Sequence, residues 1–430
     1  MATEWRTVRL GDICRTIYRY PSFYGMEKHS TGVPVIRGEH LLDSGRISTD
    51  WKHYWFVSKE YAAQFPKTKL EEHDIVMSVR GTVGQFAQVG SAHVGAQISP
   101  NTIRISPDPR KVDPQFLYHA FRAHAFGHFL QGTVATSAVP GLRAGDIKEA
   151  PLNLPPLAEQ KAIAAVLGAL DDKIELNRRM NATLEAMARA LFQSWFVDFD
   201  PVRAKLDGRQ PHGVDPATAG LFPNEFEDSE LGHIPNGWHV KTVGDVGKVI
   251  CGKTPRTSVG TYYGNDIPFI TIPDMHGNVF AAATARKLSH AGANSQANKT
   301  LPAGSLCVSC IATPGLVIIT SEPSQTNQQI NSIVPHQTEE TYFWYWALVD
   351  LGAEIAASGS GGSVLANLNK SRFETLRVVK PPHALICDYN RRVRPIFEAI
   401  LANSLQSRTL SAVRDTLLPK LLSGQVIVLR

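Results

Sequence analysis

The feature that most constrains the fold of this 430-residue chain is an internal repeat, because a module used twice must build the same architecture twice. WRTVRLGDI begins at residue 5 and WHVKTVGDV at residue 238, a displacement of 233 residues. Four further pairs keep the same order at displacements between 226 and 234: GVPVIRGEHL (32–41) with DIPFITIPDM (266–275), DIVMSVRGTVG (74–84) with SLCVSCIATPG (305–315), AQISPNTI (96–103) with QQINSIVP (328–335), and APLNLPPLAEQ (150–160) with LRVVKPPHALI (376–386). One module of about two hundred residues is therefore expected twice.

Each module begins with β-strand patterns and ends with a helix pattern. Short alternating apolar segments such as VPVIRG, DIVMSV and NTIRIS are typical of β-strands. After the double prolines at 155–156 and 381–382, apolar residues recur with 4-3 spacing, which predicts two long helices that bury seams against each other. Two ordinary amphipathic helices, each on its own domain, are the alternative. The expected packing residues are Ile163, Leu167, Leu170, Ile174, Leu184, Leu191, Val393, Ile396, Ile400, Leu410 and Leu417.

Polar residues occupy the same two seam positions in both helices, Asn177 with Asn403 and Asn181 with Ser407. A buried Asn fixes the register of a coiled coil at some cost in stability. The fold class predicted is α+β, with two β-rich globular domains separated by two long helices. The expected boundaries are domain 1 at 1–156, helix 1 at 157–200, a connector at 201–235, domain 2 at 236–382 and helix 2 at 383–430.

Composition excludes several classes of protein. A hydrophobic content of 43% with 19% charged residues describes a globular chain, not a disordered one. No apolar run approaches the ~20 residues that span a bilayer, and the N-terminus lacks the pattern of a secretion signal. Five scattered cysteines form no disulfide framework and favour a reducing cytoplasm. The net charge of +5 is compatible with a polyanionic partner.

GKVICGKT (247–254) fits the P-loop spacing G-x-x-x-x-G-K-[ST], and a nucleotide hydrolase is therefore the alternative function. A P-loop needs a strand before it and a helix directly after it. Here Pro255 follows at once, and RTSVGTYYGNDIP offers no apolar helical face. The stretch YWALVD (345–350), which could pass as a strand ending in a metal-binding Asp, aligns with the helix-like FLYHAFRAH (116–124). We therefore interpret the match as accidental.

Other catalytic motifs are weak. Cys307 and Cys310 have zinc-knuckle spacing, but they lie in a strand pattern without a second cysteine pair, so a structural strand is expected and no metal. The histidines form no ligand cluster, and no G-x-S-x-G, G-x-G-x-x-G or amino-methyltransferase motif occurs. The sequence thus predicts a binding protein, not an enzyme.

Several segments resemble signatures of the specificity subunit of Type I restriction–modification enzymes. They are PPLAEQKAI (155–163), ALFQSWFVDFDPVRAK (190–205), LFPNEFEDSELGHIPNGW (221–238) and LLPKLLSGQV (417–426). Together with the repeat, the resemblance covers essentially the whole chain. It implies that the two β-rich modules are target recognition domains, each reading one half of a split double-stranded DNA site, and that the two helices pack antiparallel as a spacer.

The resemblance also implies partners. The helices would dock two methyltransferase subunits, which bind S-adenosylmethionine and methylate adenine, while restriction subunits translocate and cleave DNA. This chain would then be non-catalytic, bind no cofactor itself, avoid membranes and act in phage defence in a prokaryotic cytoplasm. A purely structural coiled-coil scaffold is a third reading.

The DNA-contacting residues are predicted from side-chain chemistry. Phosphates attract Lys, Arg and backbone amides, whereas base edges are read by Arg at guanine and by Asn or Gln at adenine. For each residue the alternative is an ordinary solvated turn. The predicted loop positions are Arg37, Arg80, Thr82, Gln97, Thr133 and Arg143 in the first module, and Lys253, Thr254, Arg256, Thr313, Gln329, Asn331 and Ser363 in the second.

Overall fold

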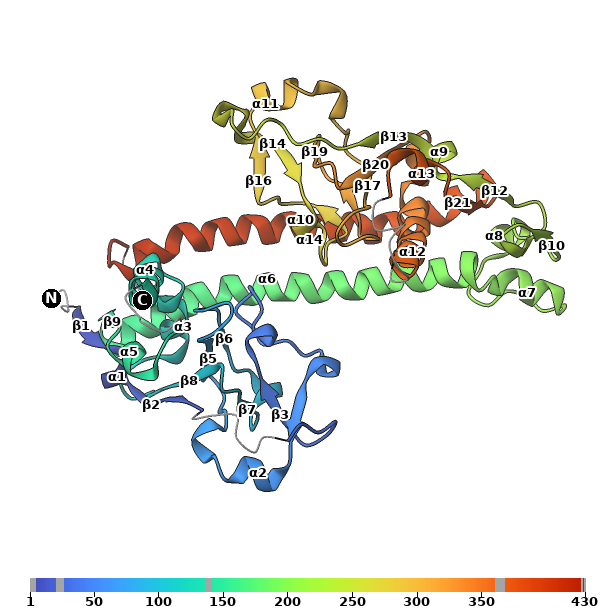
Figure 1. Cartoon of the computed structure of the whole chain (residues 1–430). Helices are drawn as coiled ribbons and strands as arrows, with labels where there is room; N and C mark the ends of the chain where they lie inside the picture. Colours follow the sequence, from blue (N-terminus) through green and yellow to red (C-terminus); the bar gives the residue numbers. More distant parts are fainter. Residues whose placement is uncertain (1–4, 21–26, 136–140, 360–367, 427, 429–430) are drawn as a thin grey trace. The chain divides into compact units, whose positions relative to one another are not determined.

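The computed structural model describes residues 5–20, 27–135, 141–359, 368–426 and 428 (Figure 1). Ser363 lies outside the described residues. Residue contacts divide the chain into two compact units. Unit 1 comprises Met1–Asp172 with Leu410–Arg430, and unit 2 comprises Lys173–Thr409.

Unit 1 contains a four-stranded sheet of order β2-β8-β5-β6, a three-stranded sheet of order β4-β3-β7 and the pair β1-β9. Every residue of β5 and β8 is buried, which explains the apolar run of β5. The strands are β1 (Arg6–Arg9), β2 (Cys14–Arg19), β3 (Val33–Ile36), β4 (Trp55–Val57), β5 (Ile75–Ser78), β6 (Phe86–Gln88), β7 (Gln97–Ile98), β8 (Thr102–Pro107) and β9 (Pro151–Leu154). The short helices are α1 (Leu10–Ile13), α2 (Lys59–Ala63), α3 (Pro114–Phe121), α4 (His124–Ala135) and α5 (Ala144–Lys148).

Unit 2 repeats this plan with a five-stranded sheet of order β13-β20-β17-β18-β15, a three-stranded sheet of order β16-β14-β19 and the pair β12-β21. The strands are β12 (His239–Thr242), β13 (Gly247–Cys251), β14 (Tyr263–Ile270), β15 (Phe280–Ala281), β16 (Arg286–Leu288), β17 (Leu306–Ser309), β18 (Val317–Thr320), β19 (Gln325–Thr326), β20 (Ile330–Pro335) and β21 (Arg377–Lys380). The helices are α9 (Val243–Val246), α10 (Ile272–Met275), α11 (His290–Asn294), α12 (Thr341–Gly359) and α13 (Lys370–Glu374). The predicted repeat and the expected helix at 345–350 are confirmed.

The sheet register corrects one segment of the sequence alignment. Ile75 pairs with Ile105 in unit 1, and Leu306 pairs with Ile333 in unit 2. The strands β8 and β20 are therefore related by 228 residues (105 to 333), not by the 232 residues of the AQISPNTI–QQINSIVP match. Cross-strand pairing fixes which residues face the core, and a shared Gln-Ile dipeptide does not. Gln97 consequently corresponds to Gln325, and both begin a two-residue strand parallel to its neighbour.

A further repeated segment escaped the sequence comparison. Ser58 caps α2 by accepting a hydrogen bond from Tyr61 N, and Ser289 caps α11 by accepting one from Gly292 N. Too few residues are shared for this segment to stand out, because a cap needs only one hydroxyl at the right place.

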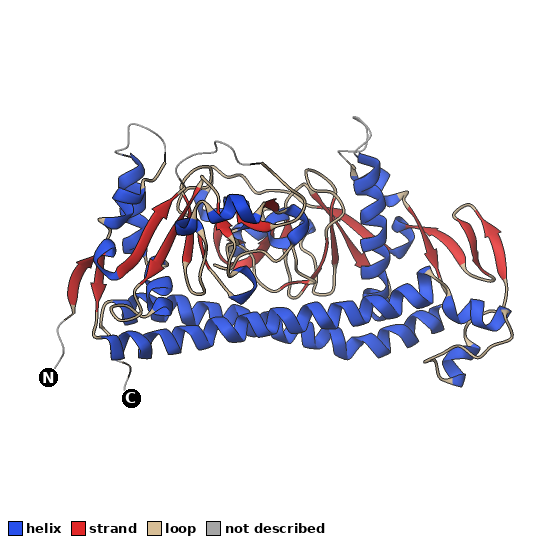
Figure 2. Cartoon of the chain, turned by 90° about the horizontal axis from the view of Figure 1, so that it is seen from below, coloured by secondary structure: helices blue, strands red, loops and turns tan. Residues whose placement is uncertain are grey.

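The two long helices are α6 (Leu157–Phe192), which continues into a π-helical turn (Gln193–Val197), and α14 (His383–Leu422). Within unit 2, Nδ2 of Asn181 donates to Ile400 O at 3.3 Å, and the Tyr389 hydroxyl donates to Ala188 O at 3.1 Å. Residue numbers rise along α6 while those of their partners fall along α14, so the helices are antiparallel, as predicted (Figure 2).

The buried Asn177 binds the facing helix at three points. Its Nδ2 donates to Asn403 O at 3.3 Å, to Gln406 Oε1 at 2.9 Å and to Ser407 Oγ at 3.2 Å. Displacing the helices by one turn would leave this amide buried without these partners, which penalises other registers.

The helix ends complete the cores of the units. In unit 1, Ile163 and Leu167 are buried together with Leu418 and Leu421 against the sheet. The compact units therefore extend past the boundaries expected at 156 and 382. The predicted seam residues are all at least partly buried. Those that are fully buried are Ile163, Leu167, Val393 and Ile400, and those that are partly buried are Leu170, Ile174, Leu184, Leu191, Ile396, Leu410 and Leu417.

The connector expected at 201–235 is a folded part of unit 2. It carries α7 (Asp200–Leu206), α8 (Pro216–Gly220) and the hairpin β10 (Phe226–Ser229) with β11 (Gly232–Pro235). Val202, Phe222 and Ile234 are buried in the core of unit 2.

Candidate nucleic-acid interface

Three strand ends meet at one end of the four-stranded sheet of unit 1. β2 and β5 end here and β8 begins here, because Arg19 pairs with Ile103 and Ser78 with Thr102. The loop 79–85 joins β5 to β6 at this end, and the chain passes it again before α5, where Leu142 N donates to Val79 O at 3.3 Å. We term Arg19 with residues 79–85, 99–101 and 141–143 the first strand-end surface.

Unit 2 builds the same surface. Cys251 pairs with Asn331 and Ser309 with Ile330, so β13 and β17 end where β20 begins. The loop 310–316 joins β17 to β18, and Leu368 N donates to Cys310 O at 3.3 Å. We term residues 251–256, 310–316, 327–329 and 368–369 the second strand-end surface.

The loops at the centre of the two surfaces have the same hydrogen bonds. The Ser78 hydroxyl donates to Thr82 O, and Gly84 N donates to Ser78 O. The Ser309 hydroxyl donates to Thr313 O at 2.6 Å, and Gly315 N donates to Ser309 O at 2.9 Å. The exposed tips are thus held on one fixed backbone while their side chains differ.

At both loop tips one residue adopts the left-handed backbone conformation. Gly81 has φ 74°, and its counterpart Ala312 has φ 67°. A side chain in this region costs roughly 1 kcal/mol.

We expect Ala312→Gly to stabilise unit 2 by up to about 1 kcal/mol, and Gly81→Ala to destabilise unit 1 by about 1 kcal/mol. A Cβ at Gly81 would meet no atom within 4 Å, so backbone strain alone is tested. Urea denaturation of both variants measures the two changes in the free energy of unfolding. Changes of the same sign would contradict a shared conformation.

The first strand-end surface carries cations that have no carboxylate partner in the described part of the chain. Arg80 and Thr82 are exposed, and Arg19 is partly buried, with its Nε donating to Pro100 O at 3.1 Å. Burial lowers the pKa of Arg19, and the charge of Arg80 lowers it further. Within the described ranges, no ion pair joins either arginine to an acid, whereas Arg15 near the other end of β2 pairs with Glu71 at 2.8 Å. Sequence reasoning missed Arg19, although its place at the end of the first core strand was a usable signal.

The second strand-end surface carries hydroxyl and amide groups beside its cations. Lys253, Arg256 and Thr313 are exposed. Thr254 Oγ1 donates to Gln328 Oε1 at 2.7 Å. Gln329 is partly buried, and its Oε1 accepts a hydrogen bond from Asn327 at 2.9 Å.

The P-loop alternative is wrong. Gly252 N donates to Ile330 O at 3.0 Å and Lys253 N donates to Thr326 O at 2.9 Å, so the amides that would cradle a phosphate are already used. β13 leads into a stretch without helix, and the next helical turn is a 3-10 turn at Gly260–Tyr262.

Two predicted loop positions are wrong. Gln97 lies in β7 at 4% exposure and Asn331 in β20 at 2% exposure. Gln97 Nε2 donates to Ala62 O at 3.2 Å, and Asn331 Nδ2 donates to Leu368 O at 3.2 Å. Periodicity showed that these segments were strands, but not that the amides hold neighbouring chain segments in place.

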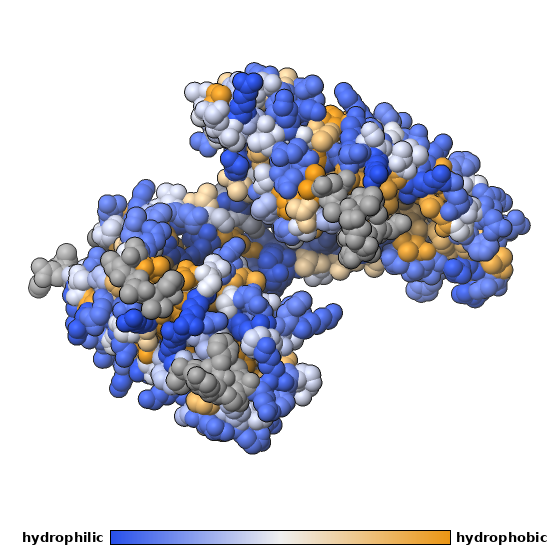
Figure 3. All heavy atoms as spheres, in the orientation of Figure 1, coloured by the Kyte–Doolittle hydropathy of each residue, from blue (hydrophilic) through white to orange (hydrophobic). Residues whose placement is uncertain are grey.

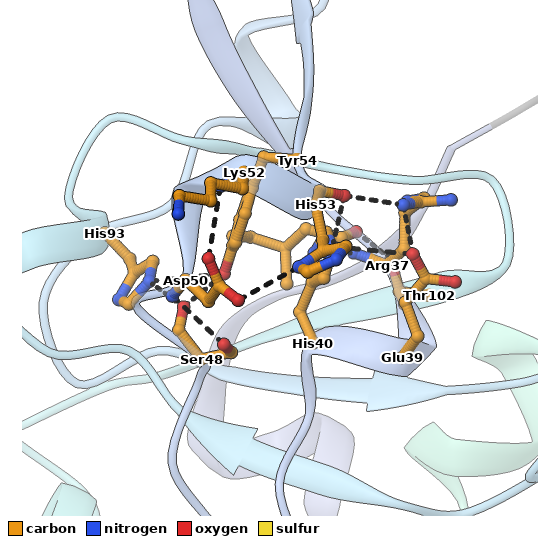
Figure 4. A network of polar contacts seen from close by, with 11 residues as sticks. Arg37, Glu39, His40, Ser48, Asp50, Lys52, His53, Tyr54, His93 and Thr102 are labelled. Carbon is orange, nitrogen blue, oxygen red and sulfur yellow. Dashed lines mark hydrogen bonds and ion pairs between the residues drawn. The ribbon is translucent and has the colours of Figure 1, made fainter. Parts of the chain in front are cut away.

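The Arg37 guanidinium is also occupied within its own module. It donates to His53 O at 2.9 Å and pairs with Glu39 (Figure 4). It also lies 3.9 Å from the Trp55 ring centre. Burial lowers the pKa of the neighbouring His40. This network holds the Arg37 guanidinium against its own module.

The two remaining first-module predictions lie on helices. Thr133 is in α4, partly buried, with its hydroxyl donating to Phe129 O at 2.8 Å. Arg143 is exposed at the N-cap of α5, within the first strand-end surface.

The cysteine pair has no metal-binding arrangement. Cys307 and Cys310 are buried, and burial raises their pKa to about 12 and about 11. Among the described residues, no group of three His, Cys, Asp or Glu could hold a metal ion. The same part of the chain has no helix long and apolar enough to cross a membrane.

Figure 3 shows a largely hydrophilic surface with interspersed apolar side chains. Leu176, Met180 and Met187 of α6 are 50%, 42% and 56% exposed. Their spacing of four and seven residues places them on one side of the helix. This α6 stripe is the longest helical run of exposed large apolar residues in the described chain.

Comparison with known proteins places both modules in one family. The Type I restriction modification DNA specificity domain matches residues 2–186 and 235–384. The chain belongs to the family of Type I restriction–modification specificity subunits.

Relatives of this specificity subunit cover most or nearly all of its length. It is 34% identical to the Type I restriction enzyme HindI specificity subunit of Haemophilus influenzae over 467 aligned residues, covering 99% of this chain and 100% of the relative. The MjaIX specificity subunit of Methanocaldococcus jannaschii is 28% identical, over 73% of this chain and 69% of its own. The crystal structure of a Type I S subunit from M. genitalium shares the fold, with a TM-score of 0.55 at 14% identity over 97% and 96% of the two chains.

Proposed function

We propose that this specificity subunit reads a split DNA target, one half through each strand-end surface. The observation that carries the proposal is the pair of loops with the same hydrogen bonds and different side chains at their tips. The exposed Arg80 stands in one loop where the partly buried Ile311 stands in the other, whereas Thr82 and Thr313 are exposed threonines in both. A rigid scaffold with variable loops is the usual way to change recognition without changing the fold.

The two kinds of side chain on these surfaces suit two kinds of contact. Lys253, Arg256 and Arg80 are exposed cations that fit phosphates, which position a protein on the duplex. Gln328 and Arg19 carry groups that fit base edges. Lys253 therefore meets the DNA backbone in this proposal, not a nucleotide.

The proposed partners follow from the family and from the helices. Large exposed apolar residues on one helix face mark an interaction surface, and the α6 stripe is where we place a methyltransferase subunit. In this proposal two such subunits bind S-adenosylmethionine and methylate adenine, restriction subunits join for cleavage, and the specificity subunit binds no cofactor and catalyses no step. The raised pKa of Cys307 agrees with an inert thiol.

A loop exchange tests the proposal. The chain is expressed with its partner subunits, loop 310–316 is replaced by the sequence of loop 79–85, and methylated adenines are mapped across the host genome. The expected result is a change confined to one half of the methylated motif. An unchanged motif would favour a coiled-coil scaffold, and ATP hydrolysis lost in Lys253→Ala would favour the hydrolase.

A further inference from the structure

Arg19 is a partly desolvated cation, and among the described residues the charged group that acts on it is another cation, Arg80. Burial is the main cause of its lowered pKa, and the charge of Arg80 is the second. Its one hydrogen bond among the described residues goes to a backbone carbonyl. Burying a charge without a counter-ion costs free energy, so an anionic or acceptor-rich ligand is the natural partner of this group.

The anchored geometry selects the kind of contact. The Pro100 carbonyl accepts the Nε hydrogen of Arg19 at 3.1 Å, which orients the guanidinium plane. The two terminal nitrogens then present a parallel pair of donors. A guanine offers the matching pair of acceptors, O6 and N7, at its major-groove edge. Arg80, at the exposed tip of its loop, has no such anchor among the described residues and suits a phosphate.

The sheet register shows that unit 2 lacks this pair of arginines. Arg19 pairs with Ile103, and the equivalent strand position in unit 2 pairs Cys251 with Asn331. Ile311 likewise stands where Arg80 stands in unit 1. The end of the core strand thus carries a forked donor in one unit and a thiol in the other.

We propose that Arg19 reads a guanine in the half-site bound by unit 1, and that unit 2 makes no equivalent contact. This inference rests on the proposed function. It makes the two half-sites chemically different: one contains a guanine recognised through O6 and N7, and the other is read through groups such as Gln328.

The test uses the complete methyltransferase complex and duplexes carrying its mapped target. Each guanine of the target is replaced in turn by 7-deazaguanine, which removes N7 and keeps base pairing. We expect one replacement, in the half assigned to unit 1, to weaken binding by the wild-type complex roughly 5- to 150-fold. The same replacement should have almost no further effect on a complex with Arg19→Ala, because the contact is already lost.

Two further variants serve as controls for this test. Arg19→Lys keeps the charge but not the fork and should behave like Arg19→Ala. Arg110→Ala removes an exposed arginine paired with Asp108 beyond the other end of β8 and should bind every duplex as the wild type does. Thermal unfolding confirms that the variants fold.

Three results would overturn the inference. The first is that Arg19→Ala weakens binding to all duplexes equally and reduces the slope of log affinity against log salt concentration by about one. That result would mark a phosphate contact. Another is a guanine-free half-site for unit 1, and the third is full activity of Arg19→Lys. A wild-type complex that methylates no split site would instead refute the proposed function itself.

Discussion

Replacing Gly252 by alanine is expected to lower the free energy of unfolding of unit 2 by about 3 kcal/mol, the upper end of overpacking penalties. A Cβ at this position would lie 2.0 Å from Asn327 O and 2.5 Å from Thr326 O. These are backbone atoms at the start of the segment that leads into β20, so they cannot rotate away as a side chain would. The glycine of the GKT stretch is required by packing.

The control is Gly260→Ala, because a Cβ there would meet no atom within 4 Å. Urea denaturation should show a change within about 0.5 kcal/mol for the control and a clear shift of the midpoint for Gly252→Ala. Equal stabilities would show that the close approach of the two segments is wrong. Lys253 is exposed, and Lys253→Ala should leave stability almost unchanged.

Acid is expected to destabilise unit 1 through His119. This side chain is 1% exposed in α3, and neither ring nitrogen has a hydrogen-bond partner within the described structure. Burial lowers its pKa from 6.5 to about 4, against the opposing effect of Asp171, whose carboxylate lies 3.9 Å away. Arg122 and Arg414, which both bind Asp171, add to the lowering.

The direction of the effect follows from proton uptake. Between the two pKa values the unfolded chain binds the proton and the folded unit does not, so the free energy of unfolding falls as the pH drops from 6.5 toward 4. The full loss is about 3 kcal/mol. His119→Leu removes no hydrogen bond and should abolish this contribution. Urea denaturation of both proteins at pH about 7 and pH about 4.5 measures it, and a constant difference between them would refute the assignment.

Local patterns in the sequence were sufficient for the architecture. Repeated sequence segments predicted two copies of one module. Alternating apolar residues predicted the strands, and the 4-3 spacing of apolar residues predicted both long helices. These signals survive because burial of a strand face or a helix stripe is written in neighbouring residues. The paired Asn positions also predicted the polar contacts of Asn177 with α14.

The candidate site was predicted less well. The predicted residues that lie on the two strand-end surfaces are Arg80, Thr82, Arg143, Lys253, Thr254, Arg256, Thr313 and Gln329. Gln97 and Asn331 have the side chains of adenine readers, but they are buried and bind backbone carbonyls. Arg19 was missed because its place at the end of a core strand does not by itself show which charged groups lie beside it.

The sequence by itself determined that this protein is a duplicated recognition module on two long helices. The tertiary structure alone decided which residues correspond between the copies and which polar groups remain available for DNA. The physical reason is that sheet register and burial depend on partners far along the chain. The pairing of Ile105 with Ile75 shifts the alignment of the two copies by four residues. The backbone amides of Gly252 and Lys253, which the P-loop motif would use for phosphate, instead donate to carbonyls of distant segments.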